Sequence, residues 1–404
     1  MSLDVVEAKR MGTAGPMLYT SVGEVLTRYE LDVDTATLTQ KESISFLDTV
    51  QYACPHPSGK FLYVISSYRA PVGASGTGHH LTTLAVAHDG RLEQVGQPRA
   101  LPWRPLHLSV DASGRFALVA YNDPSTVTVH RILAEGAVGA EVDQDERLDF
   151  GSFAHQVLVA PSNRAVIVAA RGYNSTPLKA EVPGSLRVFA FDEGRLAAKA
   201  VVAPNGGFGF GPRHLDFHPN HRWAYVSLER QSTLQLFELS KDGSLSASPS
   251  SSTCYLADPA NEQPRQLGGT VHVHPTGRFV YAVNRADNRK EIEGKLVFAG
   301  GENTLVTFAI DSQTGEPTII QRIATRTMHV RTFAISPCGS LLIAAGILPM
   351  WVKTGADLEF VPAALSIFRI RQDDGRLDFV RRYDVDAGVK PQWWMGVMTP
   401  CRPQ

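Results

Sequence analysis

The sequence predicts an all-β fold, a seven-bladed β-propeller formed by a single domain that spans residues 1–404. Three observations predict it: a strand–turn–strand pattern recurs six times, the interval between copies is nearly constant, and part of a further copy stands at each end of the chain. Several strands within such a period are typical of propeller blades. The fourth position of the turn recurs at intervals of 50 to 62 residues. It is occupied by Gly59, Gly114, Arg164, His221, Gly277 and Gly339.

The pattern is clearest in residues 268–285, GGTVHVHPTGRFVYAVNR. Two strands, 271–274 and 279–283, flank a His-Pro-Thr-Gly turn. Proline suits the second position of such a turn, glycine relieves its end, and the flanking β-branched and aromatic residues favour strands. An Asp-Gly or Thr-Gly turn and a weaker fourth strand finish each repeat. Third strands with alternating apolar residues are expected at 126–132, 185–191, 233–239, 304–310 and 364–370.

The two ends of the chain complement each other. Residues 17–23, 24–31 and 38–45 resemble the second, third and fourth strands of a repeat that lacks its first strand. Residues 391–404, PQWWMGVMTPCRPQ, resemble a first strand without the other three. We therefore expect the C-terminal strand to complete the first blade and close the ring, which removes exposed sheet edges. Residues 1–15 are expected to form a loose N-terminal arm.

Composition narrows the class of protein. The chain has 39 basic and 40 acidic residues, so its overall charge indicates neither a nucleic-acid partner nor a membrane surface. Four widely separated cysteines fit reduced thiols, and the charged N-terminus does not resemble a signal peptide. We expect a cytoplasmic protein; the sequence does not indicate its oligomeric state.

Two positions in each repeat are expected to meet at one mouth of the central channel. The first strand of a blade lies against the channel, and the second runs antiparallel to it. The start of the first strand and the end of the second are therefore neighbours. Six residues before the turn proline stand Gln51, Leu106, His155, Arg213, Gly269 and Arg331, with Trp394 in the closing blade, and ten residues after it stand Ser67, Asn122, Arg171, Glu229, Arg285 and Ile347.

These columns predict a cationic mouth that binds a small anion. Arg171, Arg213, Arg285 and Arg331 face a single carboxylate, Glu229, and planar guanidinium groups suit carboxylate and phosphate. The longest insertions, at 68–80, 172–184, 286–303 and 348–363, emerge at the same rim, where binding loops are expected.

His155 and Glu229 are the expected proton-transfer groups, because arginines hold Glu229 ionised and an imidazole titrates near neutral pH. Such a set adds water to a lactone carbonyl, with an arginine stabilising the oxyanion, or runs the related ring closure. The expected substrate-binding residues are Arg331, Arg171, Asn122 and His214.

No metal or other cofactor is expected. Four histidines suggest a metal cluster, but two of them occupy turns and no carboxylate accompanies the others. The columns also offer too few oxygen ligands for calcium. Trp393 and Trp394 are expected to pack within the blades rather than to form a stacking platform. The four histidines are His214, His218, His272 and His274.

The sequence resembles the lactonase family of seven-bladed propellers. The resemblance is most specific in GPRHLDFHPNHRWAYVSLE (211–229) and VHVHPTGRFVYAVNR (271–285). The family includes 6-phosphogluconolactonase-type enzymes and 3-carboxy-cis,cis-muconate lactonizing enzymes. The resemblance implies a catalytic set of His155, Arg213, Glu229 and Arg285, and Arg331 matches another arginine often present in the family.

Three functions remain open at this point. Hydrolysis of a lactone in a small anionic acid is the first expectation. A muconate-type cycloisomerase is the alternative within the same chemistry, because one acid–base set serves both directions. A non-catalytic propeller that presents a surface to protein partners is the alternative from another class.

Overall fold

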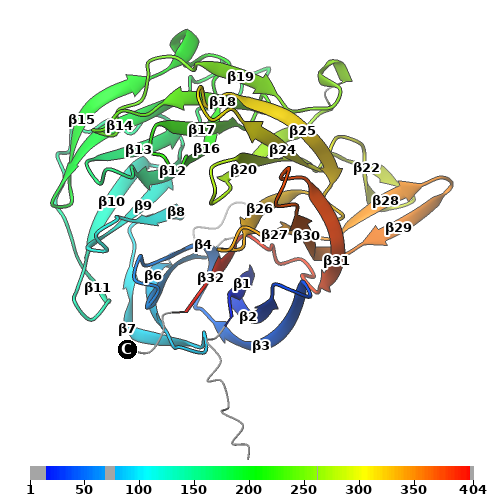
Figure 1. The fold of residues 1–404 in the computed structure, drawn as a ribbon, viewed down its shortest axis with the longest axis horizontal. Coiled ribbons are helices and arrows are strands. Elements are labelled where there is room, and N and C mark those ends of the chain that lie inside the picture. The colour runs from blue at the N-terminus through cyan, green and yellow to red at the C-terminus, as the bar shows by residue number, and fades with distance from the viewer. Residues whose placement is uncertain (1–14, 69–77, 262, 401–404) are drawn as a thin grey trace, which may run out of the picture.

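The structure, a computed structural model, describes residues 15–68, 78–261 and 263–400. Seven four-stranded antiparallel sheets stand side by side around a central axis, which confirms the predicted fold class (Figure 1). Residues 1–14 of the predicted N-terminal arm and residues 69–77 of the insertion at 68–80 lie outside the described part.

Each blade runs outward from the axis in chain order, except the blade that closes the ring. There, β32 (Met395–Met398) pairs antiparallel with β1 (Met17–Val22), followed by β2 (Val25–Asp32) and β3 (Thr37–Ser45). The first strand of this blade thus comes from the C-terminal segment, as the sequence predicts.

In each of the other six blades the strands follow one another along the chain. The second and third blades are formed by β4 (Thr49–Pro55), β5 (Phe61–Ser67), β6 (His79–Val86) and β7 (Leu92–Ala100), and by β8 (Pro105–Val110), β9 (Phe116–Asn122), β10 (Ser125–Ile132) and β11 (Val138–Glu141). The fourth and fifth blades are formed by β12 (Ala154–Val159), β13 (Ala165–Ala170), β14 (Ser185–Asp192) and β15 (Arg195–Val202), and by β16 (Pro212–Phe217), β17 (Trp223–Leu228), β18 (Thr233–Glu238) and β19 (Ser251–Cys254). The sixth and seventh blades are formed by β20 (Gln266–Val273), β21 (Phe279–Ala286), β24 (Thr304–Ile310) and β25 (Pro317–Ala324), and by β26 (Val330–Ile335), β27 (Leu341–Gly346), β30 (Ala363–Ile370) and β31 (Leu377–Val385).

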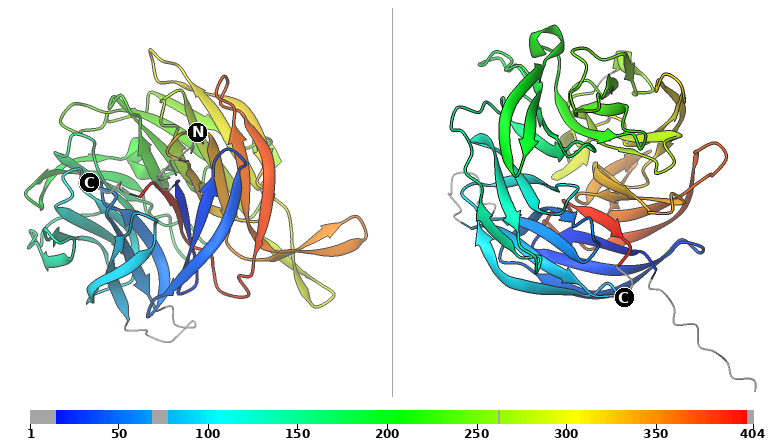
Figure 2. Two further views of the ribbon diagram at one scale, coloured as in Figure 1. Left: turned by 60° about the horizontal axis from the view of Figure 1, so that its bottom comes forward. Right: turned by 60° about the vertical axis from the view of Figure 1, so that its left-hand side comes forward.

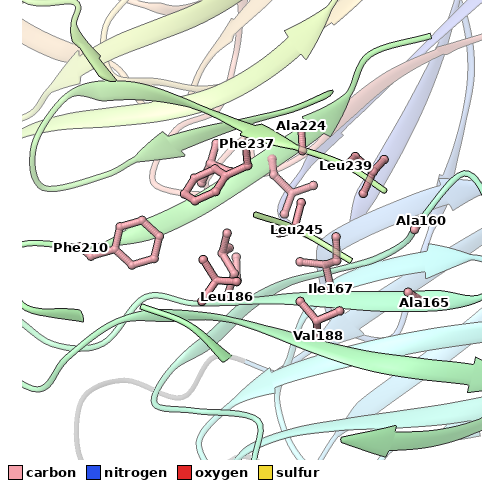
Figure 3. Packing of buried hydrophobic residues seen from close by; sticks show 14 of the residues in the cluster. Ala160, Ala165, Ile167, Leu186, Val188, Phe210, Ala224, Phe237, Leu239 and Leu245 are labelled. Atoms are coloured by element: carbon pink, nitrogen blue, oxygen red, sulfur yellow. The ribbon is translucent and has the colours of Figure 1, made fainter. Parts of the chain in front are cut away.

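The core of the protein lies between adjacent blades. Every residue of β13, β17 and β27 is buried, because a second strand is covered by a neighbouring blade on each face, and these strands are almost continuously apolar. Fourth strands such as β15 face solvent and are mostly exposed. Figure 3 shows one interface, in which Ile167 and Val188 of one blade belong to the same cluster as Ala224 and Phe237 of the next.

Buried tyrosine hydroxyls tie four of the seven second strands to a glycine turn in the next blade. Tyr225 donates a hydrogen bond to the Gly315 carbonyl at 2.7 Å, and Tyr281 donates to Gly375 at 2.8 Å. Tyr19 and Tyr63 make the same contact with Gly90 and Gly136. The turn requires glycine, because a Cβ at Gly375, which has a φ of +74°, would lie 2.4 Å from the Phe279 ring.

Two insertions that the sequence left without a structure combine into one accessory sheet. Hairpins β22–β23 (Arg289–Ile292 and Lys295–Phe298) and β28–β29 (Met350–Thr354 and Asp357–Val361) come from neighbouring blades. A parallel bridge between Val297 and Trp351 joins them. The accessory sheet projects from the propeller beside β31, as both views in Figure 2 also show.

Two short 3-10 helices, η1 (Pro204–Gly207) and η2 (Pro259–Asn261), interrupt this pattern in the described part of the chain. None of the helices found there has the length and apolar character needed to cross a membrane.

We predict that Tyr281→Phe lowers the free energy of unfolding by about 1–2 kcal/mol, because the Gly375 carbonyl loses its partner in a buried site. Urea unfolding of both proteins measures the difference. Tyr68→Phe, at an exposed tyrosine, is the matched control and is expected to change stability by less than about 0.5 kcal/mol. Equal losses in the two variants would contradict the role assigned to the inter-blade hydrogen bond.

Candidate functional site

The predicted site residues that stand six positions before the turn proline lie where the strand register shifts. Between β12 and β13, Ala154 pairs with Ala170 and Gln156 pairs with Ala169, so His155 has no pairing partner on β13. Arg213 and Arg331 occupy the same place in their own blades. Such β-bulges redirect a side chain out of the regular alternation. In these three blades the fold therefore aims this position at the channel mouth.

A cavity of about 740 Å³ lies at this mouth. Of the eight predicted site residues, seven line it, and His214 borders a second cavity instead. His155 and Glu229 therefore share one opening of the ring, which is the geometry that proton transfer to a common ligand requires. The seven are Asn122, His155, Arg171, Arg213, Glu229, Arg285 and Arg331.

The Glu229 carboxylate is buried among three guanidiniums. It accepts hydrogen bonds from Arg171 Nη1 and Arg285 Nη2, and Arg213 Nε lies 3.0 Å from its Oε1 as an ion pair without hydrogen-bond alignment. Burial alone raises the pKa of Glu229, but the charges of Arg285, Arg171 and Arg213 outweigh it and lower the pKa to about 2. Glu229 is therefore ionised and a weak proton acceptor at neutral pH.

Positive charge exceeds negative charge throughout this cavity. Eight arginines line it against two carboxylates, Glu229 and Asp287. Arg213 Nη1 is buried without a hydrogen-bond partner among the described residues. Burial, together with the charge of Arg285, lowers the pKa of Arg213 to about 9. An anion in the cavity would relieve this uncompensated charge.

Arg331 is the second guanidinium that a ligand can engage. Its Cζ lies 4.1 Å above the Trp393 ring, and within the described residues its guanidinium forms no ion pair or side-chain hydrogen bond. Burial and the charges of Arg213 and Arg285 hold the pKa of Arg331 well below its usual value. The expectation that Trp393 only packs within the blades is wrong, because this ring supports Arg331 and lines the cavity.

His155 is less basic than the sequence indicated. Burial, followed by the charges of Arg213, Arg331 and Arg171, holds the pKa of His155 well below its usual value near 6.5. Its Nδ1 is buried without a hydrogen-bond partner in the described part of the chain. The expectation of an imidazole that titrates near neutral pH therefore needs correction: His155 is uncharged at neutral pH, and its unprotonated ring nitrogen can accept a proton.

Further residues that line the cavity escaped the sequence analysis. His329 Nε2 accepts a hydrogen bond from Arg285 Nη1 at 2.8 Å, and Arg104 Nη2 donates to Gln51 Oε1 at 3.0 Å. His329 stands two residues before Arg331, and Arg104 stands two residues before Leu106. Following this position through the repeats, eight residues before the turn proline, would have found both residues. Arg289 and Met350 come from the accessory sheet, whose insertions the sequence left unassigned.

A second cavity of about 300 Å³ continues from the first along the channel. Leu106, His155, Arg331 and Trp393 line both cavities and form the layer between them. His214 lies beyond this layer with its ring centroid 5.2 Å from that of His155. The structure therefore separates His214 from the arginine cavity in which substrate binding was expected.

The four histidines that suggested a metal cluster do not form one in the described residues, where no group of three or more His, Cys, Asp or Glu side chains is placed to hold an ion. His218 and His274 instead bond through Nε2 to the carbonyl oxygens of Gly277 and Gly339, at 2.8 and 2.7 Å. These two histidines link the turns of successive blades.

Because several buried histidines have lowered pKa values, we predict that the free energy of unfolding decreases in mild acid. Burial also lowers the pKa of His107 to about 3 and that of His214 well below 6.5. Below pH 6.5 the unfolded chain binds protons that the folded chain does not, so stability is full above that pH and decreases as the pH falls. Between pH 7.5 and 5.5 we expect a loss of about 1 kcal/mol for each such histidine.

Urea unfolding of the wild type and His155→Asn at both pH values measures this effect. The variant should lose about 1 kcal/mol less than the wild type across the interval. His88→Asn, at an exposed histidine, should follow the wild type. A loss that is the same in all three proteins would contradict the low pKa of His155.

Comparison with known proteins gives one family. A family model described as "Lactonase, 7-bladed beta-propeller" matches residues 17–347. The 6-phosphogluconolactonase of Yersinia pestis (strain Pestoides F) is 26% identical over 371 residues, which cover 90% of this chain and 92% of that protein. The 6-phosphogluconolactonase of Serratia proteamaculans (strain 568) is 25% identical over 366 residues, covering 89% and 92% of the two chains.

Solved structures agree with this fold. A periplasmic gluconolactonase of Pseudomonas aeruginosa superposes with a TM-score of 0.69 at 20% identity, covering 95% of this chain and 99% of that one. A putative 6-phosphogluconolactonase of Bacteroides fragilis gives a TM-score of 0.67 at 17% identity, covering 95% and 98%. At these identities the likeness extends to the fold alone.

Proposed function

The chain belongs to the lactonase family of seven-bladed β-propellers, and on this basis we propose that it hydrolyses the ring of a small anionic lactone. The observation that carries the proposal is the meeting of an uncharged His155 with the available guanidiniums of Arg213 and Arg331 in one cavity. A base beside cationic hydrogen-bond donors is what addition of water to an ester carbonyl requires.

In the proposed reaction, the lactone carbonyl lies against Arg331 and Arg213, which stabilise the oxyanion as it forms. His155 takes a proton from water while the water oxygen bonds to the carbonyl carbon. The bond between this carbon and the ring oxygen then breaks, and the imidazolium returns its proton to the ring oxygen. The role of Glu229 differs from the sequence expectation: its low pKa makes it a positioning residue that holds three arginines.

The proposed substrate is a sugar-acid lactone that carries a further anionic group. The names of the curated relatives support the sugar acid, and the eight arginines of the cavity support more than one negative charge. We propose a cytoplasmic location, which the free thiols of Cys54, Cys254 and Cys338 support.

A muconate-type cycloisomerase is the second candidate, and the apolar part of the cavity wall favours it. Phe153, Tyr173, Leu348 and Met350 face the same space as the arginines, and they suit an unsaturated polycarboxylate better than a polyhydroxylated ring. A non-catalytic scaffold is less well supported, because the available guanidiniums lie inside a cavity rather than on an exposed face.

Purified protein assayed with 6-phosphogluconolactone, uncharged gluconolactone and 3-carboxy-cis,cis-muconate tests the proposal. We expect hydrolysis of the phosphorylated lactone with the highest kcat/KM, because the arginines contribute to its binding. Turnover of the muconate alone would establish the second candidate, and no turnover of any substrate would overturn both.

Replacing the proposed base gives the sharper prediction. His155→Asn should lower kcat by about a hundredfold or more, because the variant cannot accept a proton from water. His88→Asn is the matched control at an exposed histidine and should retain the wild-type rate. An unchanged kcat in His155→Asn would show that another group is the base.

The cationic cavity also predicts stabilisation by anions independently of turnover. We expect 6-phosphogluconate to raise the Tm, with a gain of about 2.7 kcal/mol at a hundred times its Kd. Arg331→Gln should weaken this gain, because no carboxylate of the described residues forms an ion pair with Arg331, which rests on the Trp393 ring. Arg369→Gln, which removes an arginine near the outer turn at 33–34, is the control. Equal gains in both variants would contradict anion binding by Arg331.

A further inference from the structure

The second cavity follows the channel axis from the site to the opposite face of the ring. Its wall includes every residue from Arg331 to Pro337, which runs from the bulge of β26 through the end of this strand into the following turn. It also includes two exposed prolines of other blades, Pro55 at the end of β4 and Pro275 in the turn after β20. His155 therefore borders two spaces, the arginine cavity on one side and a passage to the far turns on the other.

Hydrogen-bonding groups begin this passage next to His155. The His214 ring lies 5.2 Å from the His155 ring, and His214 Nδ1 is 3.1 Å from Thr270 Oγ1. Thr270 donates its single hydroxyl proton to the Arg331 carbonyl at 2.8 Å. Thr270 therefore accepts from His214, which fixes the proton of His214 on Nδ1 and leaves its Nε2 as an acceptor.

His272 and Asp216 continue the series toward solvent. His272 lines the passage, its side chain is 38% exposed, and its Nδ1 lies 3.5 Å from Asp216 Oδ2. A volume of about 300 Å³ has room for several water molecules, at roughly 30 Å³ each, between His214 and His272. Water and side chains together therefore span the distance from His155 to the far face.

Hydrolysis of a lactone at neutral pH releases one proton for each turnover. Lactone and water give a hydroxy acid, whose carboxyl group ionises to a carboxylate and H⁺. The near mouth opposes the exit of this proton, because eight arginines line the cavity there. The passage on the other side of His155 instead leads to a histidine paired with a carboxylate.

We propose that His214, His272 and Asp216 form a proton relay that releases the proton of each turnover through the far opening of the propeller. The relay rests on the hydrolysis proposed above. The product carboxyl passes its proton to His155, which passes it to His214, and water in the passage carries it to His272 and Asp216. No net charge accumulates in the passage, since each group returns to its starting state.

The groups that face the relay from neighbouring strands are mostly cationic or uncharged. The charges of Arg213 and Arg331 act on His155, the charge of Arg213 acts on His214, and the ring of His107 is 6.0 Å from that of His214. These charges disfavour storage of a proton on His155 or His214 and favour its movement toward Asp216.

His272→Ala tests the relay in weakly buffered solution near pH 7 with the lactone that the wild type hydrolyses. We expect kcat to fall by about tenfold while KM is kept, and we expect added imidazole, which fits the passage, to restore it. His88→Ala should show neither effect. A wild-type kcat in His272→Ala, or a loss that imidazole leaves unchanged, would overturn the relay.

A second variant covers the case in which His272→Ala does not fold. Ala334 lines the passage, so Ala334→Phe should obstruct it and lower kcat without raising KM. Ala112→Phe makes the same change on an exposed turn and should leave kcat unchanged. Equal kcat values in these two proteins would overturn the relay. Absence of lactone turnover in the wild type would instead overturn the proposed function.

Discussion

The buried carboxylate of Glu229 is the interaction on which the site depends. It contacts Arg171 of one blade, Arg213 of its own blade and Arg285 of the next, so one negative charge holds three guanidiniums and three blades together. Removing it would leave buried, mutually repelling cations, a change that typically costs several kcal/mol. The same contacts keep the carboxylate ionised and occupied. Glu229 thus supports the cavity rather than carrying protons through it.

A repetitive scaffold makes this asymmetric site possible. Six of the seven inner strands have a register shift at this position, but only some of these blades place a reactive side chain there, such as His155 or Arg331, while another has Leu106. The backbone supplies equivalent geometry in each repeat, and the side chain at that single position decides its chemistry. Short stretches before the first strand then add Arg104 and His329 without disturbing the blade.

The sequence predicted what depends on local pattern. Periodicity located the blades, with 304–310 matching β24 (Thr304–Ile310), and the two positions followed through the repeats found nine of the 25 residues that line the cavity. The sequence analysis missed the accessory sheet, because the bridge between Val297 and Trp351 joins insertions of two different blades that are far apart in the chain. It also missed the low pKa of His155, which depends on burial and on charges from several blades. Properties set by three-dimensional convergence have no local signature in the sequence.

The arginines give His155 a state that changes when an anion binds. Their charges suppress protonation of the imidazole, so that His155 is available as a base when the substrate arrives. An anionic lactone brings negative charge beside the same guanidiniums and offsets their repulsion of a proton on His155. The imidazole therefore becomes more basic when the substrate is present. A single set of charges thus binds the anion, keeps the base available and couples its basicity to occupancy of the site.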